Sequence, residues 1–360
     1  MSSLNEITQS GALIADQVRD AYEAGSCLSI VGAGSKAFYA PPRPDVNRVS
    51  LRSHSGVVSY EPSELVVTVR AGTPIKSVES MLGSRGQQFP FEPPVFTGSD
   101  TIGGMIACGL SGSRRPYAAS VRDAMLGVQI VNGKGEILNF GGQVIKNVAG
   151  YDVSRLMAGS LGTLGVVLQA SIKVVPKPAM EVTLVRELPS GADVYSALSD
   201  IRLFTPNVTG LACYEQRLYV RIAGSEPVIS QCAARIGGDI DEDAERFWRA
   251  LKDQRLPFFQ GVASLWRVSL PPATGALALG DEQVLDWGGA LRWIQSDRPA
   301  HSVMDTAAAA GGHAVLFRTP DTALERFPAL SPPVLQLHQR IKHAFDPQGV
   351  FSSDYHGAEA

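Results

Sequence analysis

The chain has 360 residues, of which 44% are hydrophobic and 19% are charged, and its formal net charge is −3. This composition supports a sizeable core and excludes wholesale disorder, and the charge balance leaves no electrostatic case for binding nucleic acid or an anionic membrane. At roughly 150 residues per domain, the length predicts about two domains. Because the four cysteines are widely spaced without a CxxC pair, we exclude a cysteine-ligated zinc or iron–sulfur cluster and expect a reducing compartment. The apolar runs predict neither a signal peptide nor a transmembrane helix.

The first 25 residues have the spacing of an amphipathic helix, with Gly25 as its C-cap. The expected apolar face of this helix consists of Leu13, Ile14, Val18 and Tyr22. The elements expected next are strands over 27–31, 57–60 and 64–72, a helix over 74–83 and a short glycine-rich helix within 101–110.

Residues 126–140 alternate as a hairpin whose turn signal is Asn132-Gly133. A loop, a short helix and a glycine-rich turn are expected over 146–165, and a strand over 166–175. The prolines at 176–178 indicate a domain boundary. Beyond it the order of elements is β-α-β-β-α-β, with the last strand at 264–271, which is typical of an antiparallel ferredoxin-like domain. The chain then ends in a helix with Ser331 as N-cap and Pro332 at its first position.

Glycines cluster at three places far apart in the sequence, over residues 32–36, 98–112 and 159–165. Glycine lets backbone N–H groups turn toward a phosphate and lets the chain approach it closely. The prolines within 41–44 preclude the helix that a Rossmann fold needs after the first cluster, and a Walker A loop is absent. Taken alone, that cluster is better explained by an ordinary tight turn. Three such loops indicate instead an extended ligand with the length of a dinucleotide.

Several segments resemble the FAD-binding domain of the vanillyl-alcohol-oxidase-type, or PCMH-type, flavoproteins. They are ELVVTVRAGTPI, TIGGMIACGLSGSRRPYAASVRDAMLGVQIVNGKGEIL, KNVAGYDVSRLMAGSLGTLGVV and the closing DPQGVF. KNVAGYD, together with SGSRRPYAASVRD and a short cap, is similar to the E-subunit family of FAD-binding proteins in bacterial glycolate oxidases. The resemblance implies an α+β fold. A PCMH-type FAD-binding domain of two α/β subdomains would span 1–178, a smaller antiparallel ferredoxin-like cap 179–330, and a C-terminal helix and tail returning to the FAD domain 331–360.

The resemblance also implies which residues bind FAD. They form four segments: a loop that binds the pyrophosphate, a second segment whose backbone holds the cofactor, a stretch that runs toward the flavin, and the start of a strand whose backbone contacts the isoalloxazine or adenine portion. Some members attach the flavin to a histidine in or near the first loop. Since this loop reads GAGSK, we expect non-covalent FAD. In the order given, the residues are Gly32, Ala33, Gly34, Ser35 and Lys36; Thr101, Gly103 and Gly104; Ser111, Gly112 and Arg115; and Gly165 and Val166.

Other chemistry-bearing candidates are few. Arg114 and Arg115 are the one basic pair in a glycine-rich context, and either they grip a phosphate or carboxylate or they are solvated. His338 and His343 lie five residues apart and share no helix face, so no metal site is expected. The acidic run 241–245 is interpreted as a solvated helix start. No residue is assigned a catalytic role.

The resemblance implies an FAD-dependent oxidoreductase subunit of a glycolate oxidase complex. It would oxidise glycolate to glyoxylate and pass electrons to a homologous catalytic flavoprotein and an iron–sulfur subunit. Related dehydrogenases carry a histidine-rich motif and a metal-binding cluster of residues in the cap, whereas this chain has only GGHAVLFR at 311–318, with one histidine. Two alternatives stay open: a stand-alone FAD-dependent dehydrogenase of a small 2-hydroxy acid, and a non-enzymatic scaffold. We expect a cytoplasmic location or, as the alternative, peripheral attachment to the inner membrane through partner subunits.

Overall fold

The computed structural model describes two compact units of the chain. Unit 1 comprises 1–111, 119–176 and 329–360, and unit 2 comprises 112–118 and 177–328. The divisions near 176 and 328 lie close to the boundaries at 178 and 330, which stay a prediction, but the segment 112–118 groups with unit 2. The described residues are 2–39, 41, 45–142, 151–189, 191, 193–204, 207–261, 263–280, 282–321 and 324–351, without the side chains of 2–9 and 204.

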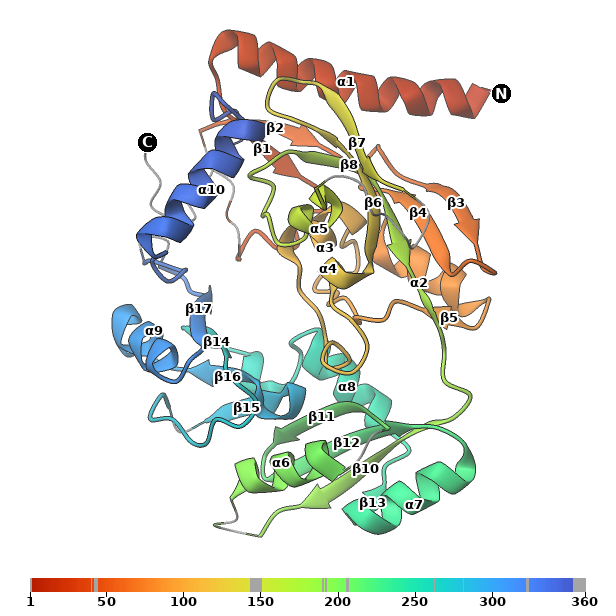
Figure 1. Ribbon diagram of the computed structural model, residues 1–360, viewed down its shortest axis with the longest axis vertical. Coiled ribbons are helices and arrows are strands. Elements are labelled where there is room, and N and C mark those ends of the chain that lie inside the picture. The colour runs from red at the N-terminus through yellow and green to blue at the C-terminus, as the bar shows by residue number, and fades with distance from the viewer. Residues whose placement is uncertain are drawn as a thin grey trace. The chain divides into compact units, whose positions relative to one another are not determined.

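Unit 1 is built on a five-stranded antiparallel sheet of order β3-β4-β8-β6-β7, with a parallel pair β1-β2 and a short pair β5-β9 (Figure 1). Its strands are β1 Leu28–Val31, β2 Asn47–Ser50, β3 Val57–Glu61, β4 Val66–Arg70, β5 Gln87–Gln88, β6 Met125–Val131, β7 Ile137–Gly141, β8 Val166–Lys173 and β9 Val175–Pro176. Its helices are α1 Ser2–Ala24, α2 Ile75–Gly83, α3 Ile102–Cys108, α4 Val121–Ala124, α5 Val153–Met157 and α10 Pro332–Phe345.

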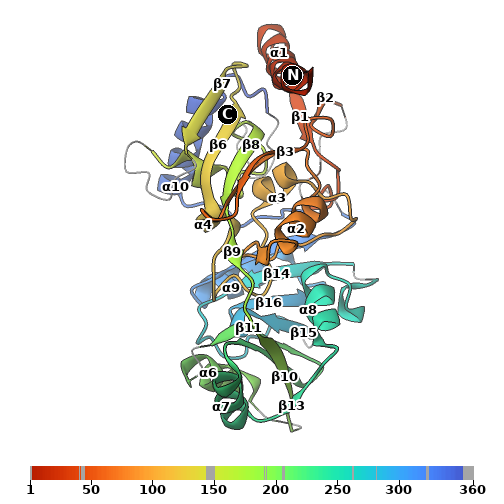
Figure 2. The ribbon, with the colours of Figure 1, turned by 90° about the vertical axis from the view of Figure 1, so that its right-hand side faces the viewer.

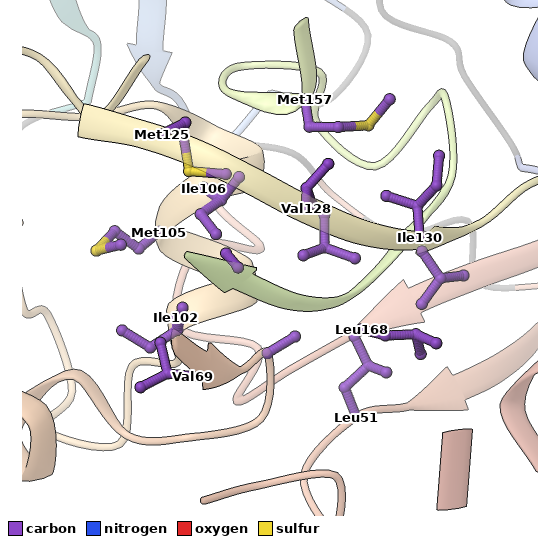
Figure 3. Packing of buried hydrophobic residues seen from close by; sticks show 14 of the residues in the cluster. Leu51, Val69, Ile102, Met105, Ile106, Met125, Val128, Ile130, Met157 and Leu168 are labelled. Atoms are coloured by element: carbon purple, nitrogen blue, oxygen red, sulfur yellow. The ribbon is translucent and has the colours of Figure 1, made fainter. Parts of the chain in front are cut away.

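Helix α3 joins the core of this unit. Its Ile102 and Ile106 are fully buried in the cluster that also contains Val69 of β4 and Val128 of β6 (Figure 3). Gly103 permits the close approach of helix and sheet, because a Cβ there would come within 2.9 Å of the Ala71 Cβ. The N-terminus of α3 is therefore held against the end of β4 by packing.

One sequence expectation for unit 1 is wrong in detail. Leu13 is 57% exposed, whereas Ile14 and Val18 are buried, so the buried stripe of α1 excludes Leu13. The hairpin expected over 126–140 is confirmed, and its turn begins at Asn132-Gly133. Asn132 Oδ1 accepts hydrogen bonds from the N–H groups of Lys134 and Glu136 in this turn. The loop expected at 146–150 lies outside the described residues.

Unit 2 contains one eight-stranded sheet of order β13-β10-β12-β11-β15-β16-β14-β17, and all its pairs are antiparallel (Figure 2). Its strands are β10 Glu181–Glu187, β11 Val208–Tyr214, β12 Arg217–Ala223, β13 Asp239–Ile240, β14 Leu265–Ser269, β15 Gln283–Asp286, β16 Leu291–Gln295 and β17 His313–Arg318. Its helices are α6 Val194–Phe204, α7 Glu226–Ile236, α8 Ala244–Lys252, α9 Ala300–Ala309 and the 3₁₀ turns Pro257–Phe259 and Trp287–Gly289.

The ferredoxin-like arrangement is confirmed for half of this sheet. Strands β10, β11, β12 and β13 with α6 and α7 follow the order β-α-β-β-α-β, and both helices pack on one face of the strands. The strand expected at 264–271 is present as β14, but its assignment as the last strand of the ferredoxin-like order is wrong. It lies in the other half of the sheet, between β16 and β17. The true last strand, β13, has only two residues, both exposed, and so carries no hydrophobic alternation that a sequence could show.

Candidate functional site

One cleft of unit 1 contains segments of all three glycine clusters. It encloses about 1050 Å³, part of it open to solvent, between the end of β1, α3 and the loop before β8. This size suits a large ligand. Nine of the residues named from the sequence line it: Gly32, Ala33, Gly34, Ser35, Lys36, Thr101, Gly103, Gly104 and Gly165.

The loop after β1 turns main-chain donors toward this cleft. Within the described parts of the chain, no carbonyl or side chain accepts a hydrogen bond from the N–H groups of Gly32 to Lys36. Gly34 has φ +73°, a backbone conformation that glycine adopts without strain. A run of successive N–H groups without internal acceptors forms a concave site for an anion. The loop therefore has the donors that a pyrophosphate requires.

A buried ion pair fixes this loop from behind. Lys36 Nζ donates to Asp100 Oδ1 at 2.8 Å, and Ser35 Oγ donates to the same oxygen at 2.7 Å. The backbone N–H of Thr97 donates to Asp100 Oδ2 at 2.9 Å. Burial alone would raise the pKa of Asp100, but Lys36, Ser35 and Thr97 outweigh burial and hold that pKa well below its usual range. Lys36 thus serves as an anchor, and its charge is balanced inside the protein.

At the start of α3 a ligand can approach the backbone closely, but few backbone N–H groups are left to donate hydrogen bonds to it. The N–H of Ile102 donates to Thr73 O at 3.0 Å, and that of Gly103 to Ala71 O at 2.8 Å. Thr101 is the N-cap, and its Oγ1 accepts from Gly104 N at 3.3 Å. These N–H groups therefore already have partners, which differs from the expected backbone clasp. At Gly104 a Cβ would meet only Thr101 Oγ1, at 3.4 Å, so this side of the helix is open to the cleft.

The third wall is the loop 160–162, which α3 holds in place. The N–H of Leu161 donates to Ala107 O at 2.8 Å, and Leu161 has φ +53°, which is unusual for a branched residue. Lys342 Nζ donates to the carbonyls of Thr163 and Phe351, each at 2.8 Å, and so ties this loop to the closing segment. Phe351 itself lines the cleft. Sequence reasoning missed Leu161 and Phe351 as site residues, although the DPQGVF motif was a signal for the latter.

Ser29 of β1 provides an observation that points to a ligand. Its side chain is 5% exposed and lines the cleft, and its Oγ has no hydrogen-bond partner among the described residues. A buried hydroxyl without a partner is unfavourable by about 1–3 kcal/mol, which a polar atom bound in the cleft would offset. Ser29 could not be identified from the sequence, because it stands within an apolar strand. Burial raises the pKa of the neighbouring Cys108 thiol to about 11, so this cleft residue stays protonated at neutral pH.

Four residues named from the sequence do not line this cleft. Val166 is fully buried inside β8, and Ser111 Oγ accepts a hydrogen bond from Val121 N at 3.4 Å. Gly112 and Arg115 belong to unit 2, where Arg115 stacks on Trp287 with 4.4 Å from its guanidinium carbon to the ring centre.

Arg114 is neither a ligand grip nor a solvated side chain, so both sequence interpretations of this residue are wrong. It is 6% exposed, and its two terminal nitrogens donate to the oxygens of Glu181 at 3.0 and 2.9 Å. Burial would raise the pKa of Glu181, but Arg114 and Arg221 lower it below its usual value. This bidentate pair fastens the segment 112–118 to β10.

In the described ranges, no three histidine, cysteine or acidic side chains gather in a way that could hold a metal ion. No helix in the same ranges is long and apolar enough to cross a membrane.

Residues 8–141 match the family model of the FAD binding domain. Glycolate oxidase subunit GlcE of Escherichia coli (strain K12) is 43% identical over 349 residues, which cover 97% of each chain. Glycolate oxidase subunit GlcD of Bacillus subtilis (strain 168) is 37% identical over 36% of this chain and 27% of its own length. The solved alkyldihydroxyacetonephosphate synthase has a TM-score of 0.67 at 15% identity, covering 94% of this chain and 74% of that one, and shows the same fold. The chain belongs to the family of glycolate oxidase subunit GlcE, and its cofactor is FAD.

Proposed function

We propose that this chain is the FAD-binding subunit of a glycolate oxidase complex that converts glycolate to glyoxylate. This proposal rests mainly on the 43% identity to GlcE, which extends over 97% of both chains. The partial similarity to GlcD supports a homologous flavoprotein as the catalytic partner. An iron–sulfur subunit would receive the electrons, and the complex would reside in the cytoplasm or at the inner face of the membrane.

The cleft residues supply what FAD needs. The N–H groups of Gly32 to Lys36 would hold the pyrophosphate, and Gly104 would let a flat ring or the phosphate chain lie against α3. Ser29 Oγ would gain the partner that it lacks. FAD supplies the electron-transfer chemistry when bound. We infer a non-covalent attachment, because no histidine stands among the described residues that line the cleft and the cysteine that does, Cys108, is protonated.

The visible spectrum of the purified full chain tests this proposal. We expect a yellow protein that releases all its flavin into the supernatant on acid precipitation. A colourless protein that takes up no FAD from solution would refute the proposal. Flavin that stays with the precipitate would refute the non-covalent attachment.

A second experiment separates a complex subunit from a stand-alone dehydrogenase. Anaerobic glycolate or D-lactate should leave the flavin of the isolated chain oxidised, and adding the catalytic partner should allow it to be reduced. Bleaching of the isolated chain would support the stand-alone enzyme. D-lactate dehydrogenase of Archaeoglobus fulgidus is 32% identical over 36% of this chain and 29% of that protein. The matched share of the two chains is too small to infer that this chain has the same activity.

A further inference from the structure

The C-terminal helix α10 buries little apolar surface against unit 1. None of its 14 residues, all of which the structure describes, is buried. Ile341 and Phe345 are partly buried against the core of unit 1, whereas Leu337, one turn earlier, is 55% exposed. Most helices in proteins are stabilised by packing of an apolar face, so a helix that buries so little must be held in place by other contacts.

Lys342 makes the polar contacts that fasten this helix. Its ammonium nitrogen donates to Thr163 O and Phe351 O at 2.8 Å each, and to Asp346 Oδ2 at 2.6 Å. An ammonium group has three N–H donors, so these contacts use all of them. The acceptors belong to the loop before β8 and to the closing segment 346–351, which supply Leu161 and Phe351 to the lining of the cleft. One side chain of α10 therefore joins two walls of the cleft.

Asp346 folds the closing segment into a fixed turn. Its side chain is fully buried, and its two oxygens accept hydrogen bonds from the N–H groups of Val350 and Phe351, at 2.8 Å each. The N–H of Leu28 in β1 donates to Val350 O at 2.7 Å, and Leu28 pairs with Phe351 in a parallel bridge. The turn thus brings Phe351 against β1, the strand that leads into the loop 32–36.

The closing segment also rests on the β6–β7 turn, away from the cleft. The N–H of Gly133 donates to Phe345 O at 2.8 Å. A Cβ at Gly133 would lie 2.7 Å from Asp346 Cα and would overlap the Asp346 carboxylate. The docking of the closing segment therefore requires glycine at this position, although Gly133 is not among the described residues that line the cleft.

We propose that α10 and the closing segment 346–351 form a latch on the FAD cleft, with Lys342 as its positioning residue. In the docked latch, Lys342 holds the loop 160–163 and Phe351 in the arrangement that encloses the cofactor. Because the latch supplies part of the wall that FAD contacts, docking of the latch and binding of FAD stabilise each other by the same free energy. That FAD occupies this cleft rests on the proposed function, whereas the latch rests on the contacts within unit 1.

Hydrogen exchange of the full chain tests the coupling. Saturating FAD should slow the exchange of the amides of residues 332–351 by about tenfold or more, relative to the deflavinated protein. Lys342→Met, which keeps an unbranched side chain but removes its charge and donors, should abolish this protection and raise the Kd of FAD about tenfold or more. Gly133→Ala should also raise the Kd, although it lies outside the cleft. Arg340→Met, at an exposed position of the same helix, is the matched control and should leave both quantities unchanged.

The rise in melting temperature that FAD produces separates the latch from a merely structural role. A structural role would lower the melting temperature of Lys342→Met equally with and without FAD, whereas the latch requires a smaller FAD-induced rise than in the wild type. Gly133→Ala gives the same readouts if Lys342→Met does not fold.

Two results would overturn the latch and leave the proposed function intact. They are FAD binding that does not change the exchange of residues 332–351, and an unchanged Kd in Lys342→Met with native near-ultraviolet circular dichroism. A full chain that takes up no FAD at all would overturn both proposals.

Discussion

Substitutions at Gly104 should change the stability of the apoprotein and its affinity for FAD in opposite directions. Gly104 stands within α3, and a Cβ there would meet only Thr101 Oγ1, at 3.4 Å, before reaching the cleft. Replacing a helical glycine with alanine stabilises a protein by about 0.5–1 kcal/mol, because fewer backbone states are lost on folding. The same methyl group would occupy space that the ligand needs. Gly104→Ala should therefore raise the melting temperature of the apoprotein by about 1–3 °C and weaken FAD binding.

Gly104→Val makes the test more severe. Valine has a lower helix propensity than alanine, so the apoprotein should be about as stable as the wild type. Its branched side chain would overpack the occupied cleft by about 1–3 kcal/mol, which corresponds to about a 5- to 150-fold higher Kd. Flavin released on dilution, followed by fluorescence, measures this Kd, and thermal unfolding of deflavinated protein measures the stability.

Gly11→Ala provides the matched control. Gly11 also stands in a helix, and a Cβ there would meet His54 and Leu168 at 3.7 Å, an ordinary contact distance. This variant should gain similar stability and keep full FAD affinity. A Gly104→Val protein that retains all its flavin would refute the placement of FAD against α3.

Three further predictions concern charged and titratable groups. Asp100→Asn should lower the free energy of unfolding by about 3 kcal/mol in urea titrations, because it leaves Lys36 buried without its counterion, whereas Asp16→Asn, which breaks a half-exposed ion pair, should cost less than 1 kcal/mol. Burial and the charge of Arg70 lower the pKa of His54 below 6.5, so as the pH falls the unfolded chain takes up this proton before the folded chain does. The contribution of His54 to the free energy of unfolding should therefore be fully present above pH 6.5 and should decrease as the pH drops below it. His54→Gln should flatten this part of the stability curve. Asp243→Asn should change the melting temperature negligibly, because Asp243 is 79% exposed and its side chain makes no capping hydrogen bond.

Each of these three predictions has its own refuting result. Equal losses for Asp100→Asn and Asp16→Asn would show that the buried pair does not hold the loop. A stability curve that is flat between pH 5 and 7 would mean that His54 is not the group that binds the proton. A clear loss of stability in Asp243→Asn would contradict the interpretation of the acidic run as a solvated helix start.

The meeting of the glycine loops was predictable because each loop has strong local signals. Residues 32–36 follow a buried strand, and Thr101 caps a short helix, so both loops sit at ends of elements in the same unit. What each loop contributes was not predictable. The N–H groups of Ile102 and Gly103 donate to carbonyls at the end of β4, and this depends on how the two elements pack. A sequence shows which residues permit close approach, but it does not show which donors remain unused.

The error at Arg114 has a different origin. Arg114 and Arg115 stand beside the glycine cluster 98–112 in the sequence, and this position suggested that the pair grips a ligand, whereas the cofactor role of Arg115, which the family resemblance implied, stays a prediction. The pairing of Arg114 with Glu181, 67 residues away, places the segment 112–118 in unit 2 instead. Neither local periodicity nor charge patterning carries information on a contact at that separation. The two-residue strand β13 was missed for another reason, because its two exposed residues show no hydrophobic alternation.

The Lys36–Asp100 pair also bears on how the loop recognises an anion. Asp100 accepts hydrogen bonds from Lys36, Ser35, Thr97 and Gly98, so the positive charge nearest to the loop is cancelled within the protein. Attraction for a phosphate must then come mainly from the aligned N–H dipoles of residues 32–36, and the small side chains of residues 32–35 leave those groups accessible. Dipoles attract an anion strongly only when they are already oriented, because orienting them on binding would cost conformational entropy. The buried ion pair orients the loop in advance, so the side chain of Lys36 acts by holding the backbone of residues 32–36 in place and does not offer an unbalanced charge to an anion.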